Sequence, residues 1–399
     1  MPLKDYEYDV WNCYRCSHGE YVGQWETKSS KFSKVCPSVT KYLWDNYACH
    51  GRMDCARALI DGKLNWTGKL VDAVYKCTLC AACDVQCKRM GVTRVLEVLE
   101  EIRIKCLKDG YLPLEHRKAL DSIINLGNPF GIDERGKRLA WTKGLESKIK
   151  VLPKDKASVL LYTGSMYSLQ PLVQGTLKST SRVLGLAGVD FGVLENEKDD
   201  GFYAAQLGDK ALFERLAREN IDTFNSLGVN VIVTPDPHAY NAFMRYYPKV
   251  GKIEAEVFHV TQYVEKLIRD EKIKLKATQR EIITYHDPCN LGRVQGVYDS
   301  PRNIISAIPG IELREMERTK ENAWCCGAGG GVVTAYPDFM AWTATERVKE
   351  AEFSGASTII TACPFCEYAL RIAVGKLKSP LKVQNIVELV EKSMKGGLQ

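Results

Sequence analysis

Four cysteines within a short segment constrain this 399-residue chain more than any other feature. The segment, residues 76–90, reads KCTLCAACDVQCKRM and contains Cys77, Cys80, Cys83 and Cys87. The spacing C-x2-C-x2-C-x3-C is typical of ligands to cubane 4Fe–4S clusters, in which three thiolates hold one cluster and the fourth reaches its neighbour. A zinc site normally uses two separated pairs of ligands, and a disulfide within so tight a loop would be unusual. The segment therefore predicts an iron–sulfur site, with zinc or unpaired thiols as alternatives.

Composition predicts a soluble globular chain with room for two or three domains. The start, MPLKDYEYDV, is charged, and no apolar run approaches the roughly 18 residues of a membrane helix. We expect a cytoplasmic protein with no direct membrane span, peripheral to a membrane only through a partner. The net charge of +6 does not indicate nucleic-acid binding. In a reducing compartment, 15 cysteines more often bind metal or take part in catalysis than form disulfides.

A second, incomplete cysteine motif precedes the first. Cys13 and Cys16 have the C-x2-C spacing, and Cys36 is followed by proline, as is the last cysteine of a ferredoxin motif. The third ligand belongs three residues after Cys16, where the chain has Gly19. Either this cluster is lost or another side chain replaces the missing ligand.

Cys49, in the sequence NYACHGRMDC, is our first choice for the missing ligand because we expect it on a short glycine-containing turn. Cys55 is the second choice, and His18 and His50 are more remote ones. The alternative is that Cys49 and Cys55 are small buried apolar residues. Short helices predicted over residues 39–46, 52–60 and 70–75 would make the region an all-helical, ferredoxin-like domain.

The following segment is predicted to be an amphipathic helix. Residues 92–107 repeat apolar side chains at helical spacing, and Gly110 and Pro113 end the pattern. Cys106 falls beside the apolar face and is expected in the core rather than at a metal. Residues 111–156 contain several glycines, an Asn–Pro pair and many lysines, so we expect an irregular connector.

The rest of the chain contains an internal repeat of about 90 residues. One copy begins at SVLLYTGSMY and the other at EIITYHDPCN, and in each copy strand-like and helical segments alternate. This alternation predicts α/β layers with parallel sheets. The second copy contains the cysteines Cys289, Cys325, Cys326, Cys363 and Cys366. The matching positions of the first copy are Ser165, Asp199, Asp200, Asp236 and Ala239. The first copy thus keeps the scaffold but has lost the ligands.

Five thiolates at the carboxyl ends of parallel strands would meet in one crevice, where open α/β sheets bind ligands. The run GAGGGV after Cys326 lets backbone approach closely. Its alternative interpretation, a phosphate-binding loop, lacks the required strand lead-in and lysine. His286, just before Cys289, is a candidate for substrate or proton transfer, although such a histidine more often caps a strand end.

These motifs together resemble the D subunit of heterodisulfide reductase and its relatives, including the similar iron–sulfur subunit of class II benzoyl-CoA reductase complexes. The resemblance covers nearly the whole chain. It implies an α+β multidomain fold: an all-α two-cluster ferredoxin-like domain and two α/β "CCG" repeats, the first without its cysteines. The predicted divisions are 1–110, a connector over 111–156, 157–270 and 271–399.

The resemblance also implies the cofactors, which are two cubane 4Fe–4S clusters and one noncubane 4Fe–4S cluster. The noncubane ligands would be Cys289, Cys325, Cys326, Cys363 and Cys366. Cys77, Cys80 and Cys83 with Cys36 would hold one cubane. Cys87 would join Cys13 and Cys16 at the other cubane, and Cys49 is our first choice for its fourth ligand.

Two departures from the family pattern guide the functional prediction. Gly19 leaves one cubane a ligand short, and the first repeat has lost the second noncubane cluster that heterodisulfide cleavage is thought to use. We therefore expect an electron-transfer subunit of a larger oxidoreductase. A flavoprotein or cytochrome partner is implied because the chain has no dinucleotide fingerprint. The alternatives are a thiol/disulfide reductase acting at the noncubane cluster and a zinc-stabilised interaction module.

Overall fold

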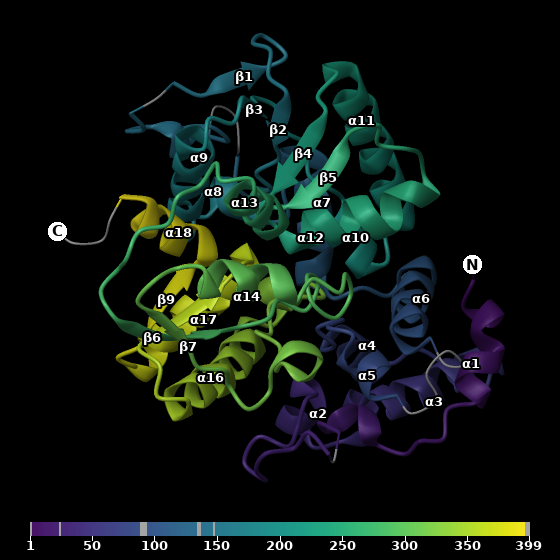
Figure 1. Ribbon diagram of the computed structural model, residues 1–399. Helices are drawn as coiled ribbons and strands as arrows, with labels where there is room; N and C mark the ends of the chain where they lie inside the picture. Colours follow the sequence, from purple (N-terminus) through teal and green to yellow (C-terminus); the bar gives the residue numbers. More distant parts are fainter. Residues whose placement is uncertain (1, 24, 88–93, 134–136, 147, 396–399) are drawn as a thin grey trace.

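The computed structural model describes residues 2–23, 25–87, 94–133, 137–146 and 148–395. Figure 1 shows a helical amino-terminal part beside two sheet-and-helix layers, which lie one above the other. The sheets have five and four strands, and all their pairings are parallel. The predicted α+β multidomain fold is confirmed. The divisions at 110, 156 and 270 remain predictions.

The amino-terminal part is helical in the described residues, apart from one antiparallel bridge between Tyr21 and Lys34. Its α-helices are α1 (Glu7–Trp11), α2 (Pro37–Tyr42), α3 (Cys49–Ile60), α4 (Gly68–Tyr75), α5 (Ala82–Gln86), α6 (Val95–Lys108) and α7 (Leu114–Leu126). Its 3-10 turns are η1 (Leu3–Tyr6), η2 (His18–Glu20), η3 (Asp45–Tyr47) and η4 (Ala140–Thr142). The α4 helix begins where the Thr67 side chain accepts a hydrogen bond from the Leu70 N–H (3.2 Å), as an N-cap does.

Two predictions for this part have a clear outcome. Cys106 is fully buried on α6, as the apolar stripe of that helix predicted. The range 111–156 was wrongly predicted to be irregular throughout, because it contains α7 and the strand β1 (Lys150–Leu152). Helix α7 buries His116, Ala119, Leu120 and Ile123 at helical spacing, a pattern that the surrounding charges obscured.

The first repeat forms the five-stranded sheet, whose strand order is β1-β3-β2-β4-β5. Its other strands are β2 (Val159–Leu161), β3 (Phe191–Leu194), β4 (Val231–Thr234) and β5 (Glu256–His259). Its helices are α8 (Ser165–Leu169), α9 (Gly175–Leu186), α10 (Phe202–Leu207), α11 (Lys210–Leu227), α12 (Pro237–Asn241), η5 (Ala242–Tyr246), η6 (Tyr247–Lys249) and α13 (Val260–Arg269). The short strand runs VLL and VIVT are almost wholly buried, as expected for a sheet covered on both faces.

The second repeat forms the four-stranded sheet in the order β7-β6-β8-β9. Its strands are β6 (Glu281–Tyr285), β7 (Ile311–Leu313), β8 (Thr358–Thr361) and β9 (Lys382–Asn385). Its helices are α14 (Asp299–Ser306), η7 (Lys320–Asn322), α15 (Val332–Ala335), α16 (Pro337–Phe353), α17 (Pro364–Leu377) and α18 (Ile386–Lys395). This order matches β3-β2-β4-β5 of the first sheet, so β1 is an addition at its edge.

One apolar cluster of buried side chains extends through both repeats and includes Val159 and Ile359 from their central strands. Helix α9 of the first repeat packs against α18 of the second. The two sheets are therefore held as one body, and the loops at the carboxyl ends of their strands face each other.

Candidate metal centres

The segment 76–87 forms a tight loop that leads into α5. Leu79 and Ala81 have left-handed backbone conformations (φ 49° and 60°), which are costly for residues with a side chain. Such strain persists only where the surrounding structure over-determines it, and metal-binding loops are one such place. One small cavity is lined by Cys36, Cys77, Cys80 and Cys83, the set predicted for a single cluster, and Cys49 lines it as well. Residues 88–90 of the predicted motif segment lie outside the described residues.

A second cavity of about 130 Å³ lies beside the first. The cysteines that line it are Cys13, Cys16, Cys49, Cys83 and Cys87. His18, Gly19 and His50 also line it, whereas Cys55 is absent from its walls and packs instead against the helical core. Cys16 is exposed, so this cavity is the one nearest to solvent.

The position of Cys49 relative to Gly19 bears directly on the missing ligand. A Cβ atom built on Gly19 would lie 2.4 Å from Cys49 Sγ, so the Cys49 sulfur fills the space that a side chain at residue 19 would occupy. Cys49 begins helix α3 and does not lie on a turn, which corrects our expectation for its local structure. A hydrogen bond from the Cys83 thiol lowers the pKa of Cys49 to about 5, which favours the thiolate that binds metal.

His50 follows Cys49, and its ring lies near two carboxylates. Its Nδ1 lies 3.3 Å from a Glu20 oxygen and its Nε2 lies 3.6 Å from an Asp45 oxygen. The Cys49 sulfur fills the space of a side chain at residue 19, so Cys49 is a better candidate than His50 for the missing ligand.

The five cysteines of the second repeat meet at the carboxyl ends of its strands. Cys289 follows β6, Cys325 and Cys326 follow η7, and Cys363 and Cys366 flank the start of α17 after β8. Exposed fractions of 8%, 2%, 3%, 2% and 2% show that all five are buried.

Sulfur–sulfur hydrogen bonds connect these thiols. Bonds from the thiols of Cys325 and Cys366 hold the pKa of Cys326 well below its usual value. Burial raises the pKa of Cys363 to about 11. Because they are so close together and so well buried, the five sulfurs can surround one inorganic group.

One buried ring nitrogen beside these cysteines, His286 Nε2, has no hydrogen-bond partner among the described residues. A buried donor without an acceptor costs about 1 to 3 kcal/mol. Five thiolates and one unpaired donor fit an iron–sulfur cluster, because its sulfur atoms accept hydrogen bonds.

The amino-terminal loop and the second repeat are in direct contact. A Cβ on Gly329 or Gly330 would lie 2.7 Å or 2.4 Å from the carbonyl oxygen of Thr78 or Cys77, respectively. The glycines therefore let the backbone of the loop approach, as the GAGGGV run indicated. The neighbouring Cys325 thiol holds the pKa of Cys80 well below its usual value, so the two cysteine sets lie next to each other.

Two arginines secure this contact. Arg103, fully buried on α6, donates hydrogen bonds to the carbonyl oxygens of Cys77 (2.6 Å) and Gly330 (2.8 Å). Arg293 Nε donates to the Cys80 carbonyl (2.6 Å). Neither arginine was expected at the site from the sequence. Arg103 had a usable signal, since Leu96, Leu99, Arg103 and Cys106 share one stripe of α6 and a charge on an apolar stripe needs a partner.

In the first repeat, a polar network occupies the positions of the missing cysteines. Ser165 Oγ donates to Asp199 (2.8 Å), and Arg138 donates to both Ser165 (3.1 Å) and Glu197 (3.3 Å). Burial raises the pKa of Asp236 to about 7. The scaffold has thus kept its shape by replacing thiolates with hydrogen-bonded side chains.

The two repeats meet at equivalent residues. His238 in the sequence DPHA and Phe365 in CPFC stack with ring centroids 4.1 Å apart, and the Asn241 side chain donates to Asn290 (2.8 Å). The first repeat therefore covers the cysteine site of the second, which explains the low exposure of those sulfurs.

Cysteine sets at the carboxyl ends of a parallel sheet and in a ferredoxin-type loop define an iron–sulfur protein built on paired cysteine-rich domains. The family model "CCG: Cysteine-rich domain" matches residues 160–243 and 283–371, so it includes the repeat without cysteines. The chain belongs to the family of iron–sulfur proteins that resemble the D subunit of heterodisulfide reductase.

Three similar proteins illustrate this. The chain is 34% identical to the D subunit of dihydromethanophenazine:CoB–CoM heterodisulfide reductase of Methanosarcina barkeri, over 81% of this chain and 78% of that protein. It is 33% identical to the probable iron-sulfur-binding oxidoreductase FadF of Bacillus subtilis over 86% of its own length, but spans only 50% of that relative. A crystal structure of a hypothetical protein from Helicobacter pylori shares the fold, with a TM-score of 0.54, 11% identity and coverage of 75% of this chain and 58% of that one.

None of the helices in the described ranges is long and apolar enough to cross a membrane.

Proposed function

We propose that this chain is an electron-transfer subunit of a larger oxidoreductase complex, which relays electrons between two cubane clusters and one noncubane 4Fe–4S cluster. The close approach of the two cysteine-containing segments supports this proposal most directly, because Cys325 neighbours Cys80 and the Gly330 backbone lies against the Cys77 carbonyl. When bound, the clusters supply one-electron carriers whose potentials depend on burial and on hydrogen bonds to sulfur.

The proposed ligand sets divide the cysteines that line the two cavities, of which Cys49 and Cys83 line both. Cys36, Cys77, Cys80 and Cys83 would hold one cubane. Cys13, Cys16, Cys49 and Cys87 would hold the other. The five cysteines of the second repeat would hold the noncubane cluster. The proposed order of the centres runs from exposed Cys16, through the loop, to the buried second repeat.

Burial favours a relay over direct disulfide chemistry at the noncubane site. A disulfide substrate must reach a ligand sulfur or an iron atom, yet no cysteine of this site is more than 8% exposed. His238 and Phe365 close the side that faces the first repeat. Electrons can leave a buried centre through a neighbouring one, whereas a substrate cannot enter it.

The proposal also includes redox partners. One relative is named as a subunit of heterodisulfide reductase and another as an oxidoreductase about twice the length of the matched region. A flavoprotein or a cytochrome is the expected partner, and any attachment to a membrane would come through it. The exposed rim of the Cys13–Cys16 cavity is where we expect that partner to exchange electrons.

Anaerobic purification with iron, sulfide and zinc analysis tests the proposal. We expect about twelve iron atoms per chain, in three clusters of four. Zinc in place of iron would refute it. Addition of disulfide substrates should leave the electron paramagnetic resonance (EPR) signal of the noncubane cluster unchanged, and a perturbed signal would instead support a disulfide reductase.

A further inference from the structure

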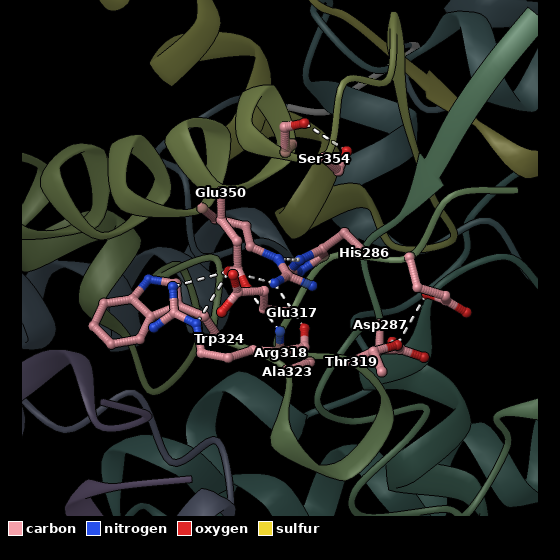
Figure 2. A network of polar contacts seen from close by, with 12 residues as sticks. His286, Asp287, Glu317, Arg318, Thr319, Ala323, Trp324, Glu350 and Ser354 are labelled. Atoms are coloured by element: carbon pink, nitrogen blue, oxygen red, sulfur yellow. Dashed lines mark hydrogen bonds and ion pairs between the residues drawn. The ribbon is translucent and has the colours of Figure 1, made fainter. Parts of the chain in front are cut away.

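A buried polar network that includes Arg318 and Glu350 orients one histidine, His286 (Figure 2). His286 directly follows β6, where its backbone N–H donates to Ile360 O (2.8 Å) and its carbonyl oxygen accepts from Thr361 Oγ1 (3.3 Å). The side chain is 1% exposed. The backbone of His286 is therefore held against the neighbouring strand β8, and the surroundings of the ring decide which nitrogen has the proton.

The guanidinium of Arg347 determines which ring nitrogen of His286 has the proton. Its Nε lies 3.1 Å from His286 Nδ1 and can only donate, because a guanidinium has no acceptor. Nδ1 must therefore present its lone pair. A histidine whose Nδ1 accepts a hydrogen bond has its proton on Nε2 and is neutral.

Arg347 cannot easily turn away. Its Nη1 donates to Glu350 (2.7 Å) and to the Arg318 carbonyl oxygen (2.9 Å). Glu350 in turn accepts hydrogen bonds from the Arg318 backbone N–H (2.7 Å) and side chain (2.9 Å). Both side chains of the Arg347–Glu350 pair are fully buried, so the arrangement is screened neither by water nor by salt.

The remaining nitrogen faces sulfur. A ring nitrogen of His286 and the sulfurs of Cys326 and Cys366 all lie within 4.8 Å of one another. Nε2 has no other partner among the described residues. Because Nε2 has the proton, it cannot be an iron ligand, and it is left as a donor aimed at the sulfur-rich site.

We propose that Arg347 locks His286 in the neutral Nε2–H tautomer, and that this N–H donates to sulfur at the Cys326 side of the noncubane centre and raises its reduction potential. This inference rests on the proposed function, because it needs a cluster in the second repeat. A hydrogen bond to sulfur stabilises the more negative, reduced state, so its loss makes reduction harder. His286 and Arg347 are thus tuning and positioning residues.

The test uses the reconstituted full chain and an EPR-monitored redox titration. His286→Asn keeps an acceptor for Arg347 but has no donor at the Nε2 position, whereas His286→Gln restores a donor there. At a fixed potential, His286→Asn should show at least a tenfold lower ratio of reduced to oxidised noncubane cluster, which is about 59 mV for one electron. His286→Gln should recover most of the loss, and the cubane signals should not move. His116→Asn, at another fully buried histidine, which packs against Tyr75 and Tyr336, should leave the noncubane potential unchanged.

The outcomes are distinct. An unshifted potential in His286→Asn with full iron content would overturn the inference, and so would loss of about four iron atoms from both His286 variants. Pulsed EPR of wild-type protein labelled with 15N-histidine gives an independent answer: weak coupling to one nitrogen is expected, and the strong coupling of a ligated nitrogen would refute it. Wild-type protein without any noncubane signal would instead refute the proposed function.

Discussion

The replacement of the missing cubane ligand can be tested by moving the ligand back. Cys49 Sγ lies 2.4 Å from the Cβ position of residue 19, and Gly19 has a backbone conformation open to any L-residue. A sulfur placed on residue 19 would therefore come close to the present position of Cys49 Sγ. Three variants test this: Cys49→Ala, Gly19→Cys, and the double variant with both changes.

The structure predicts a non-additive result. Cys49→Ala should remove one cluster and lower the iron content from about twelve to about eight atoms per chain. Gly19→Cys alone should be destabilising, because the new Cβ would overlap the Cys49 sulfur and overpacking costs about 1 to 3 kcal/mol. Together, the two changes should restore about twelve iron atoms, since the substitution that removes the ligand also makes room for its replacement.

Iron and sulfide analysis with EPR spectroscopy of the reduced proteins measures this directly. Cys55→Ala is the matched control, because Cys55 lies on the same helix but not on the cavity wall, and it should retain every cluster. Full iron content in Cys49→Ala would refute the assignment. Eight iron atoms in the double variant, as in Cys49→Ala, would show that Gly19 and Cys49 do not share one ligand position.

Three further predictions concern the contact between the domains and the effect of pH. Gly330→Ala should destabilise the protein by about 2 to 3 kcal/mol, because the new Cβ would lie 2.4 Å from the Cys77 carbonyl oxygen and residue 330 has a left-handed backbone (φ +63°). A lower Tm and slower electron transfer between the clusters would show this. Arg103→Met should cost about 3 kcal/mol, because it leaves five carbonyl acceptors without their donor, and an unchanged Tm would contradict that role. Burial lowers the pKa of His116 to about 3, of His238 to about 4 and of His259 to about 3. Below about pH 6.5 the unfolded chain therefore binds more protons than the folded chain. The stability that is present above that pH is lost as the pH falls, by up to about 1.4 kcal/mol per pH unit for each histidine. His116→Phe should flatten the fall in Tm between pH 7 and 5, and an identical slope would contradict the buried neutral state.

The sequence predicted those features that depend on local spacing. The cysteines of the loop lie within one turn-forming segment, so their shared role can be read without knowing the fold. The two repeats were found because similar gaps separate their corresponding ligand positions, and the matching strand orders confirm them. The helical patterns were found wherever apolar periodicity was strong, as in α6, and missed where charges interrupt it, as in α7.

Only the tertiary structure decided the relations between distant residues. The space shared by Gly19 and Cys49 depends on how η2 packs against α3, and no spacing in the sequence encodes a distance between them. Arg103 and Arg347 are fully buried and donate to acceptors from other segments, and only the packing of the chain shows which acceptors these are. The contact between Cys80 and Cys325 also joins segments far apart in the chain. Candidate ligands are thus indicated largely by local spacing, whereas the environment of each one results from packing, because burial and hydrogen-bond partners come from elements that meet only when the chain folds.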